Sequence, residues 1–249
     1  MAMVVQIHSF GPLAVEVAGE SVIQPGRNQK KILELLATII ALGGRNVNGN
    51  LLKEILWPDA EGDLADLSLG TSLHRLRKLI GKEAVLLNTG MVSLNDGCCW
   101  LDLWIFETIS CKLENVLKCS DQQPLATELV DQLMTLYRGT FLKNYDSGWI
   151  LLKQEQLLDR LIRLLNLSAD CYEQHGENER TSQLLSKILE LRPLSEANYR
   201  RLMQHYIKLG WTDQALHIYR QCQRILSGGF NIPLSSEIHR LAKQLQTGT

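Results

Sequence analysis

The feature that most constrains the fold of this 249-residue chain is a 34-residue repeat in its second half. Gly176 and Gly210 lie 34 residues apart, and a tyrosine precedes each by four residues, at Tyr172 and Tyr206. Each glycine stands between two segments whose apolar residues have helical spacing, as expected where glycine ends a helix. The other matched positions are Glu179 with Asp213, Leu184 with Ile218, and Leu185 with Tyr219. The repeat predicts stacked helical hairpins.

This pattern resembles the tetratricopeptide repeat (TPR), and the segment Gln214–Tyr219 is similar to the start of its second helix. A chance match within any array of helical hairpins is the alternative. Two units are fewer than the roughly three that a free-standing stack needs, so flanking helices must cap it. We expect an all-α, TPR-like domain over residues 101–249. Its helices are predicted near residues 103–119, 125–138, 149–175, 178–191, 195–209, 211–226 and 235–246.

The first hundred residues combine short apolar runs with short helical segments. Val4–Ile23 contains two apolar runs separated by Gly11-Pro12, which predicts a small antiparallel sheet. Three helices are predicted next, over 29–41, from about 48 or 50 to 56, and over about 64–80. A hairpin with its turn at Thr89-Gly90 follows. This order predicts an α+β winged helix-turn-helix domain over residues 1–100.

The third predicted helix has an apolar stripe opposite a cationic face. Leu69, Leu73, Leu76 and Ile80 lie within about 60° of one another on a helical projection, so they form a core stripe. The opposite face and its flanks carry Thr71, Ser72, His74, Arg75, Arg77 and Lys78. Arginine can contact guanine through two hydrogen bonds, hydroxyls can reach bases or phosphates, and lysine neutralises the backbone.

Two interpretations of this helix are open from its residues alone. One is an ordinary solvated face on a surface helix. The other is recognition of double-stranded DNA in the major groove, which the position of the helix before a hairpin favours. Thr89 in the hairpin turn completes the candidate DNA-binding set.

Composition limits the other classes of function. The net charge of −1 comes from 26 Lys+Arg and 27 Asp+Glu, and residues 1–100 hold nine Lys+Arg and ten Asp+Glu. DNA binding must therefore depend on the local cations of one helix, doubled by a second protomer. We expect no enzyme activity, cofactor or metal, because the chain has no phosphate-binding glycine motif, nucleophile motif or zinc-type Cys and His spacing. The six cysteines are expected to be reduced thiols, and the six histidines to be surface or satisfied side chains.

The remaining expectations concern location and the second half. No stretch approaches the ~20 apolar residues of a membrane span, and no leader pattern is present, so we expect a cytoplasmic, nucleoid-associated protein. The aromatic residues Trp149, Tyr172, Tyr199, Tyr206 and Tyr219 are predicted to pack between helices. Arg200, Arg201, Arg220 and Arg224 either line a concave surface for an acidic ligand or form a solvated face.

Several segments together resemble a known family. In the first half they are Phe10–Leu13, Leu51–Asp59 and Ser72–Gly81. In the second half they are Leu136–Gly139, Phe141-Leu142, Trp149, the TPR-like units and the segment around Pro233. Residues 4–100 resemble the OmpR/PhoB-type winged helix and the rest resembles the bacterial transcriptional activator domain (BTAD), a pairing typical of the SARP family of bacterial transcriptional regulators.

The resemblance implies how such a protein works. It implies base or phosphate contacts from Ser72, His74, Arg75 and Arg77, and homodimers side by side on direct-repeat sites. It also implies that the loop between the second and third helices, Trp57–Asp66, contacts RNA polymerase. The acids proposed to face the polymerase are Asp59, Glu61 and Asp63.

Two positions depart from the family pattern. The wing has Gly90-Met91-Val92 where the family usually has a basic Gly-Tyr-Arg, and Gly70 lies inside the recognition helix. Gly70 either allows close approach to the phosphate backbone or adds flexibility without a role. The missing basic wing leaves open a TPR-type scaffold with weak or no DNA binding. The absence of a receiver or nucleotide-binding motif also leaves open an effector fragment of a larger signalling ATPase.

Overall fold

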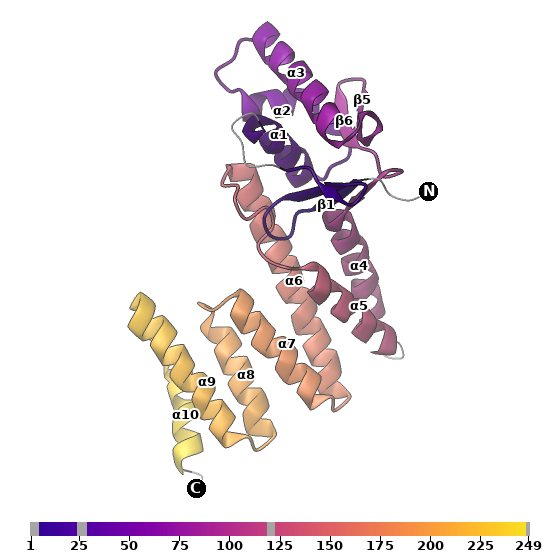
Figure 1. The fold of residues 1–249 in the computed structure, drawn as a ribbon. Helices are drawn as coiled ribbons and strands as arrows, with labels where there is room; N and C mark the ends of the chain where they lie inside the picture. Colours follow the sequence, from indigo (N-terminus) through magenta and orange to yellow (C-terminus); the bar gives the residue numbers. More distant parts are fainter. Residues whose placement is uncertain (1–4, 24–28, 119–122, 248–249) are drawn as a thin grey trace. The chain divides into compact units, whose positions relative to one another are not determined.

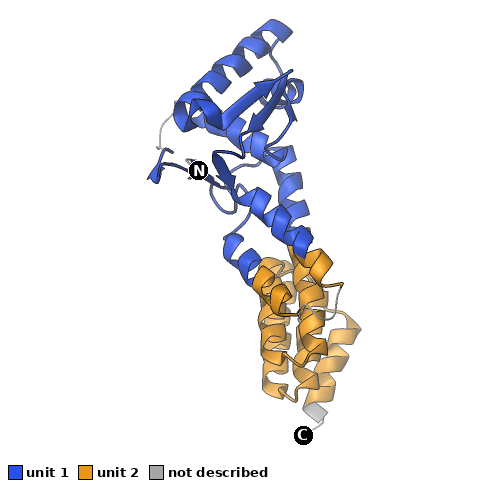
Figure 2. Cartoon of the chain, turned by 90° about the vertical axis from the view of Figure 1, so that its right-hand side faces the viewer, with its two compact units in different colours: residues 1–112, 131–158 blue, residues 113–130, 159–249 orange. Residues whose placement is uncertain are grey.

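The computed structural model describes residues 5–23, 29–118 and 123–247 (Figure 1). Its contacts define two compact units, residues 1–112 with 131–158 and residues 113–130 with 159–249 (Figure 2). Three helices contribute residues to both units: α4 (Asp102–Val116), α5 (Gln123–Leu136) and α6 (Gly148–Gln174). The division into domains at residue 100 stays a prediction. The compact units do not divide at that residue, because residues 131–158 of the helical half pack within the first unit.

A four-stranded sheet begins the first unit. Its strands are β1 (Val5–His8), β2 (Ala14–Val17), β3 (Glu20–Ser21) and β7 (Cys99–Leu101), in the order β3-β2-β1-β7. The antiparallel pairing of β1 with β2 confirms the predicted sheet, although Val4 lies outside the described residues. The parallel pairing of β1 with β7 was not predicted, because it joins segments more than ninety residues apart in the chain.

Three helices and a second sheet complete the winged helix. The helices are α1 (Lys30–Ala41), α2 (Gly49–Leu56) and α3 (Gly62–Ile80), which pack against one another. The short helix η1 (Lys82–Ala84) leads to the hairpin of β5 (Val85–Asn88) and β6 (Met91–Leu94). β6 pairs with β5 on one side and with β4 (Val47–Asn48) on the other. The predicted order of helices and hairpin is therefore confirmed.

Part of the helical half belongs to the first unit through specific contacts. The Leu142 amide donates to the Ser9 carbonyl oxygen at 2.7 Å, and Phe10 forms an isolated bridge with Phe141. The Phe10 ring also lies 5.0 Å from that of Phe106 and 5.1 Å from that of Tyr137. These aromatic contacts make one core from the segment after β1, helix α4 and the segment after α5.

The second unit contains the predicted repeat. α7 (Asn178–Leu191), α8 (Glu196–Lys208) and α9 (Thr212–Cys222) stack in sequence, and α10 (Ser236–Thr247) packs on α8 and α9. Gly176 and Gly210 have nearly equal φ values of 74° and 73°. The Glu177 amide donates to the Tyr172 carbonyl at 2.9 Å, and the Trp211 amide donates to the Tyr206 carbonyl at 2.8 Å. The 34-residue offset thus recurs in the hydrogen bonds of the two helix junctions.

Three sequence predictions are corrected. α3 begins at Gly62, two residues earlier than expected, so Asp63 and Asp66 lie on the helix and not in the preceding loop. α9 ends at Cys222, and the π-helix η2 (Gln223–Gly229) replaces the rest of the predicted helix. Trp149 is 47% exposed, so its assignment as a packing residue is wrong, whereas Tyr172 and Tyr199 are buried.

Candidate nucleic-acid interface

The buried stripe of α3 orients its outer face. Leu69, Leu73, Leu76 and Ile80 are all buried, as predicted from their spacing. Gly81 ends the helix with φ of 108°, a conformation that glycine adopts at little cost, and its amide donates to the Arg77 carbonyl at 2.9 Å. The stripe packs toward α1 and α2, so the opposite side of α3 is turned to solvent (Figure 1).

The structure places most of the predicted contact residues on that exposed side. Thr71, His74, Arg75 and Lys78 are exposed, while Ser72 is half-buried at the flank. Among the described residues, no other side chain forms an ion pair with Arg75 or Lys78. Their charges are therefore not neutralised within the protein, which leaves them available to an anionic partner.

Arg77 has a different environment from its neighbours. Its side chain is half-buried, and Nε donates to the Val85 carbonyl oxygen at 2.9 Å. This hydrogen bond joins α3 to the first strand of the hairpin. The sequence interpretation placed Arg77 at the flank of the predicted DNA-contacting face, and it missed this contact because the acceptor belongs to another element.

The hairpin, or wing, is held by its turn. Thr89 and Gly90 have φ values of 47° and 77°, as in the type I′ turns that favour hairpins. The Gly49 amide, at the start of α2, donates to the Gly90 carbonyl oxygen at 2.9 Å. A Cβ at Gly49 would lie 2.8 Å from that oxygen, so this approach requires glycine.

The wing exposes apolar side chains and carries no cation. Leu86, Leu87 and Met91 are exposed on it, and Thr89 is exposed at its tip. No Lys or Arg occurs between Val85 and Leu94. The absence of a basic wing residue, predicted from the sequence, therefore also holds for the folded surface, so the wing offers no cation to a phosphate.

The acidic residues before α3 are divided between loop and helix. Asp59 and Glu61 are exposed in the loop, and Asp63 is exposed in the first turn of α3, where the helix dipole favours a negative charge. Asp66 instead forms an ion pair with Lys53 of α2 at 2.6 Å. An acidic surface thus adjoins the start of α3, while its cations gather toward the other end.

Two exposed apolar residues on α3 were missed by the sequence analysis. Leu64 and Leu67 are 59% and 68% exposed, outside the buried stripe. Their positions on a helical projection would have placed them there, but leucine is usually assigned to a core.

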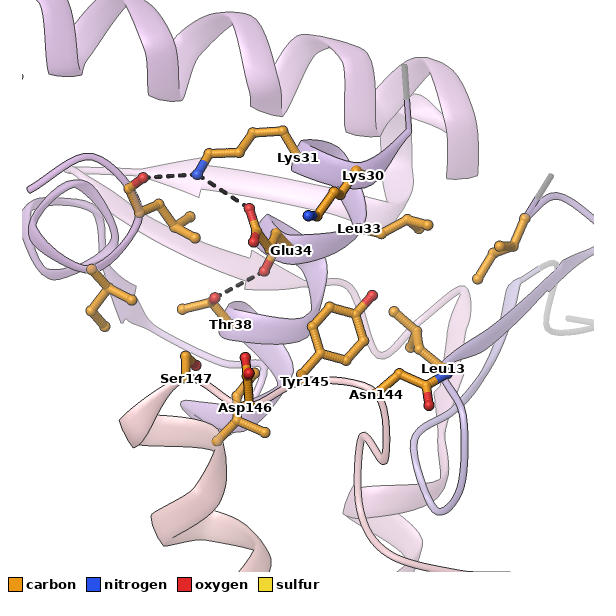
Figure 3. A pocket seen from close by; sticks show the side chains of 14 residues that line it. Leu13, Lys30, Lys31, Leu33, Glu34, Thr38, Asn144, Tyr145, Asp146 and Ser147 are labelled. Carbon is orange, nitrogen blue, oxygen red and sulfur yellow. Dashed lines mark hydrogen bonds and ion pairs between the residues drawn. The ribbon is translucent and has the colours of Figure 1, made fainter. Parts of the chain in front are cut away.

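A pocket of about 660 Å³ lies in the first unit between α1, the end of α2 and the segment before α6 (Figure 3). Lys31 Nζ donates to the Leu56 carbonyl oxygen at 2.9 Å and pairs with Glu34 at 3.2 Å. Burial, and then the charge of Glu34, raise the pKa of the Tyr145 hydroxyl. The cation and the acid are already paired with each other, and a phenol with a raised pKa is a poor nucleophile.

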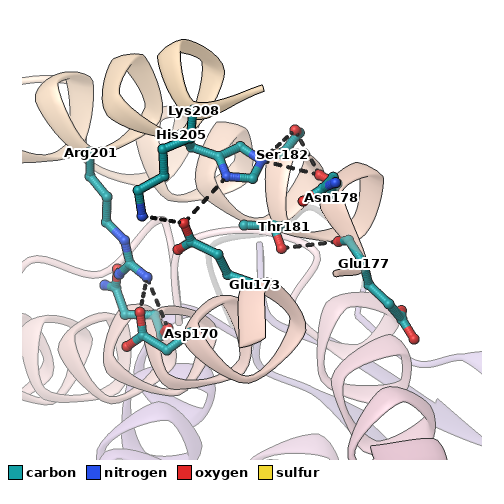
Figure 4. Close-up of polar contacts among 10 residues, drawn as sticks. Asp170, Glu173, Glu177, Asn178, Thr181, Ser182, Arg201, His205 and Lys208 are labelled. Atoms are coloured by element: carbon teal, nitrogen blue, oxygen red, sulfur yellow. Dashed lines mark hydrogen bonds and ion pairs between the residues drawn. The ribbon is translucent and has the colours of Figure 1, made fainter. Parts of the chain in front are cut away.

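The second unit has a polar cluster around buried His205 (Figure 4). Its Nε2 lies 3.2 Å from the Asn178 carbonyl oxygen and 3.1 Å from Ser182 Oγ, and its Nδ1 lies 3.9 Å from Glu173. Lys208 donates to Glu173 at 2.7 Å, and this hydrogen bond lowers the pKa of that carboxyl. The cluster joins α6, α7 and α8 through contacts within the protein, and His205 Nδ1 has no hydrogen-bond partner there within the described part of the chain.

The described cysteines are free thiols, and three of them have raised pKa values. Cys98, Cys99, Cys111, Cys171 and Cys222 are free thiols, and Cys119 lies outside the described residues. Cys171 Sγ lies 3.8 Å from His175 Nδ1, but burial raises the pKa of the Cys171 thiol. Burial also raises the pKa of the Cys99 thiol and of the Cys222 thiol to about 12. Raised pKa values keep thiols protonated and unreactive.

The structure tests three further expectations within its described residues. Arg200 pairs with Glu237 and Arg201 with Asp170, so neither is left for an acidic ligand. No cluster of three metal-ligating side chains occurs among residues 5–23, 29–118 and 123–247. In the same ranges, every helix is too short or too polar to cross a bilayer.

Comparison with known proteins agrees with this architecture. The family model described as bacterial transcriptional activator domain matches residues 101–246. Regulatory protein AfsR of Streptomyces griseus is 20% identical over 227 residues, which are 91% of this chain and 23% of AfsR. The chain therefore spans about a quarter of the length of this curated relative.

A solved structure shares the fold. Mycobacterium tuberculosis EmbR, in complex with a low-affinity phosphopeptide, matches with a TM-score of 0.70 and 18% identity over 99% of this chain and 66% of EmbR. With most of its length matched by the activator-domain model, the chain belongs to the bacterial transcriptional activator domain family, in the SARP-type arrangement of a winged helix followed by that domain.

Proposed function

We propose that this protein is a sequence-specific DNA-binding transcriptional regulator in which α3 enters the major groove. The observation that carries the proposal is the exposed row of Thr71, His74, Arg75 and Lys78 opposite a buried stripe on the same helix. A helix anchored in this way presents hydrogen-bond donors to base edges and cations to phosphates.

The charge distribution supports binding as a dimer. Residues 1–100 hold nine Lys+Arg and ten Asp+Glu, so the domain as a whole gains little from long-range attraction to DNA. Affinity for any duplex should therefore be modest for one protomer. A second protomer on an adjacent half-site multiplies the affinity without a new kind of contact.

The acidic residues at the start of α3 have a separate role in this proposal. Asp59 and Glu61 in the loop, with Asp63 in the first helical turn, contact RNA polymerase. Their negative charge disfavours contact with phosphates, so this surface suits a basic region of a protein partner.

Fluorescence anisotropy with labelled duplexes tests DNA binding. Duplexes enriched from a randomised pool should bind with affinity that falls steeply with salt, because cations on the protein displace condensed counterions. Arg75→Ala should weaken binding by about 1–3 kcal/mol and relax preference at one base position.

Arg220→Ala is the matched control, since Arg220 is an exposed arginine on α9. It should leave affinity and preference unchanged. Equal affinity of wild type and Arg75→Ala for the enriched duplex would contradict the role of Arg75.

A TPR-type scaffold without DNA binding is the second candidate, favoured by the apolar wing of Leu86, Leu87 and Met91. A winged helix that has no cation on its wing has lost one common phosphate contact. The same salt series separates the two functions, because a scaffold should bind no duplex at any salt concentration.

A further inference from the structure

The exposure of Leu67 needs an explanation beyond packing. At 68% exposed, it is the most exposed large apolar side chain of the described residues. Single apolar residues are common on protein surfaces. Leu67, however, lies on the outer face of α3, the surface that the proposed function places in the major groove.

The spacing on α3 aligns Leu67 with the polar contact residues. Leu67, Thr71, His74 and Lys78 follow one another at intervals of four, three and four residues, which keeps them in one row along a helix. At 1.5 Å per residue the row is about 16 Å long, or about five base pairs of B-DNA. If Thr71 and His74 contact bases in the groove, Leu67, one turn of α3 before Thr71, therefore also faces base edges.

The chemistry of the major groove selects what a leucine can contact there. Three of the four bases present only hydrogen-bonding groups or ring edges, whereas thymine carries a C5-methyl group. Leucine can neither donate nor accept a hydrogen bond, so a polar base edge opposite it would lose its water without compensation. The thymine methyl is the largest apolar group that a base edge presents there.

We infer that Leu67 is a specificity-determining residue that packs against the methyl group of a thymine at one end of each half-site. This inference rests on the proposed function. Leu64, one turn earlier and also exposed, extends the apolar surface toward the acidic loop.

Uracil substitution tests the inference directly. In the duplex selected by the full chain from a randomised pool, each thymine is replaced in turn by deoxyuridine, which keeps the hydrogen bonds and removes the methyl. At one thymine per half-site, the replacement should weaken wild-type binding by about three- to fivefold, the effect of one buried methyl.

Leu67→Ala should bind the thymine duplex about as weakly as wild type binds the uracil duplex, and it should no longer distinguish them. Leu152→Ala is the matched control, because Leu152 is an exposed leucine on another helix, α6. Leu152→Ala should bind the uracil duplex more weakly than the thymine duplex, by the same factor as wild type. Alanine is a good helix former, so the Leu67 variant should keep its helical circular dichroism and melting temperature.

Each outcome bears on a different claim. If wild type binds every uracil duplex as well as the thymine duplex, or if Leu67→Ala keeps the methyl effect, the inference is wrong while DNA binding stands. If the pool yields no enriched duplex, the proposed function itself is wrong and the inference falls with it. If Leu67→Ala lowers transcription by RNA polymerase but not DNA affinity, Leu67 contacts protein and the inference is overturned.

Discussion

At the scale of single residues, the most consequential group outside the candidate interface is the carboxylate of Asp102. It is 2% exposed, at the first position of α4, and it accepts three hydrogen bonds. The Ser9 amide donates at 2.6 Å, Ser9 Oγ at 2.5 Å and the Phe10 amide at 3.0 Å. A buried carboxylate in this position joins the end of β1 to α4.

Asp102→Ala should lower the free energy of unfolding by about 2–4 kcal/mol, because it leaves buried donors without an acceptor. Urea denaturation measures the loss. Asp96→Ala is the control, since Asp96 is exposed and forms a surface ion pair with Arg45, and it should cost less than about 1 kcal/mol. Equal losses in the two variants would refute the role given to Asp102.

At the scale of elements, two glycines of the winged helix have opposite requirements. A Cβ at Gly70, inside α3, would meet open space, whereas Gly49 at the start of α2 lies against the Gly90 carbonyl. Gly70→Ala should raise the free energy of unfolding by about 1 kcal/mol through helix propensity. Gly49→Ala should lower it by about 1–3 kcal/mol, because the wing must move. Thermal melts of the two variants measure both changes. If both substitutions shifted the melting temperature in the same direction, the close approach at Gly49 would not matter for stability.

The contact between α6 and α8 has a pH dependence of predictable sign. The hydrogen bond from Lys208 holds the pKa of Glu173 below its usual range. A lowered pKa in the folded state stabilises the protein above the unfolded value of about 4.3, and this stabilisation is lost as pH falls through the folded value.

Glu173→Gln should therefore lower stability by about 0.5–1 kcal/mol at pH 7 and by less at pH 3. Urea midpoints at the two pH values measure the difference. Glu20→Gln, at an exposed glutamate of strand β3, supplies the comparison and should leave both midpoints unchanged. A constant deficit across pH in Glu173→Gln would rule out the ion pair as its cause.

At the scale of the whole molecule, DNA binding and activation should be separable. Asp59→Asn combined with Glu61→Gln removes two exposed negative charges beside α3, so DNA affinity should stay equal or rise slightly. Transcription from a template carrying the selected site should fall several-fold if these acids contact RNA polymerase. Asp213→Asn combined with Glu179→Gln removes two charges from the second unit and should leave transcription unchanged. Unaltered transcription from the first variant would refute the polymerase contact.

Local patterns were enough to predict much of this architecture. The spacing of Leu69, Leu73, Leu76 and Ile80 predicted the buried stripe of α3, and the glycine offset predicted the junctions at Gly176 and Gly210. Both depend on the helical period and on the conformational freedom of glycine, which act within a few residues. The order of elements in the winged helix followed from the same signals.

Only the tertiary structure decided which distant groups meet. Three contacts join elements that are separate in the chain. β1 pairs in parallel with β7, Asp102 accepts hydrogen bonds from Ser9 and Phe10, and Arg77 donates to the Val85 carbonyl oxygen. It also decided that Leu67 and Trp149 are exposed, although both are apolar. The sequence by itself determined the elements and their buried faces, because periodicity is local. Packing between elements determined which side chains remain at the surface for a partner, because burial depends on every segment that covers a residue.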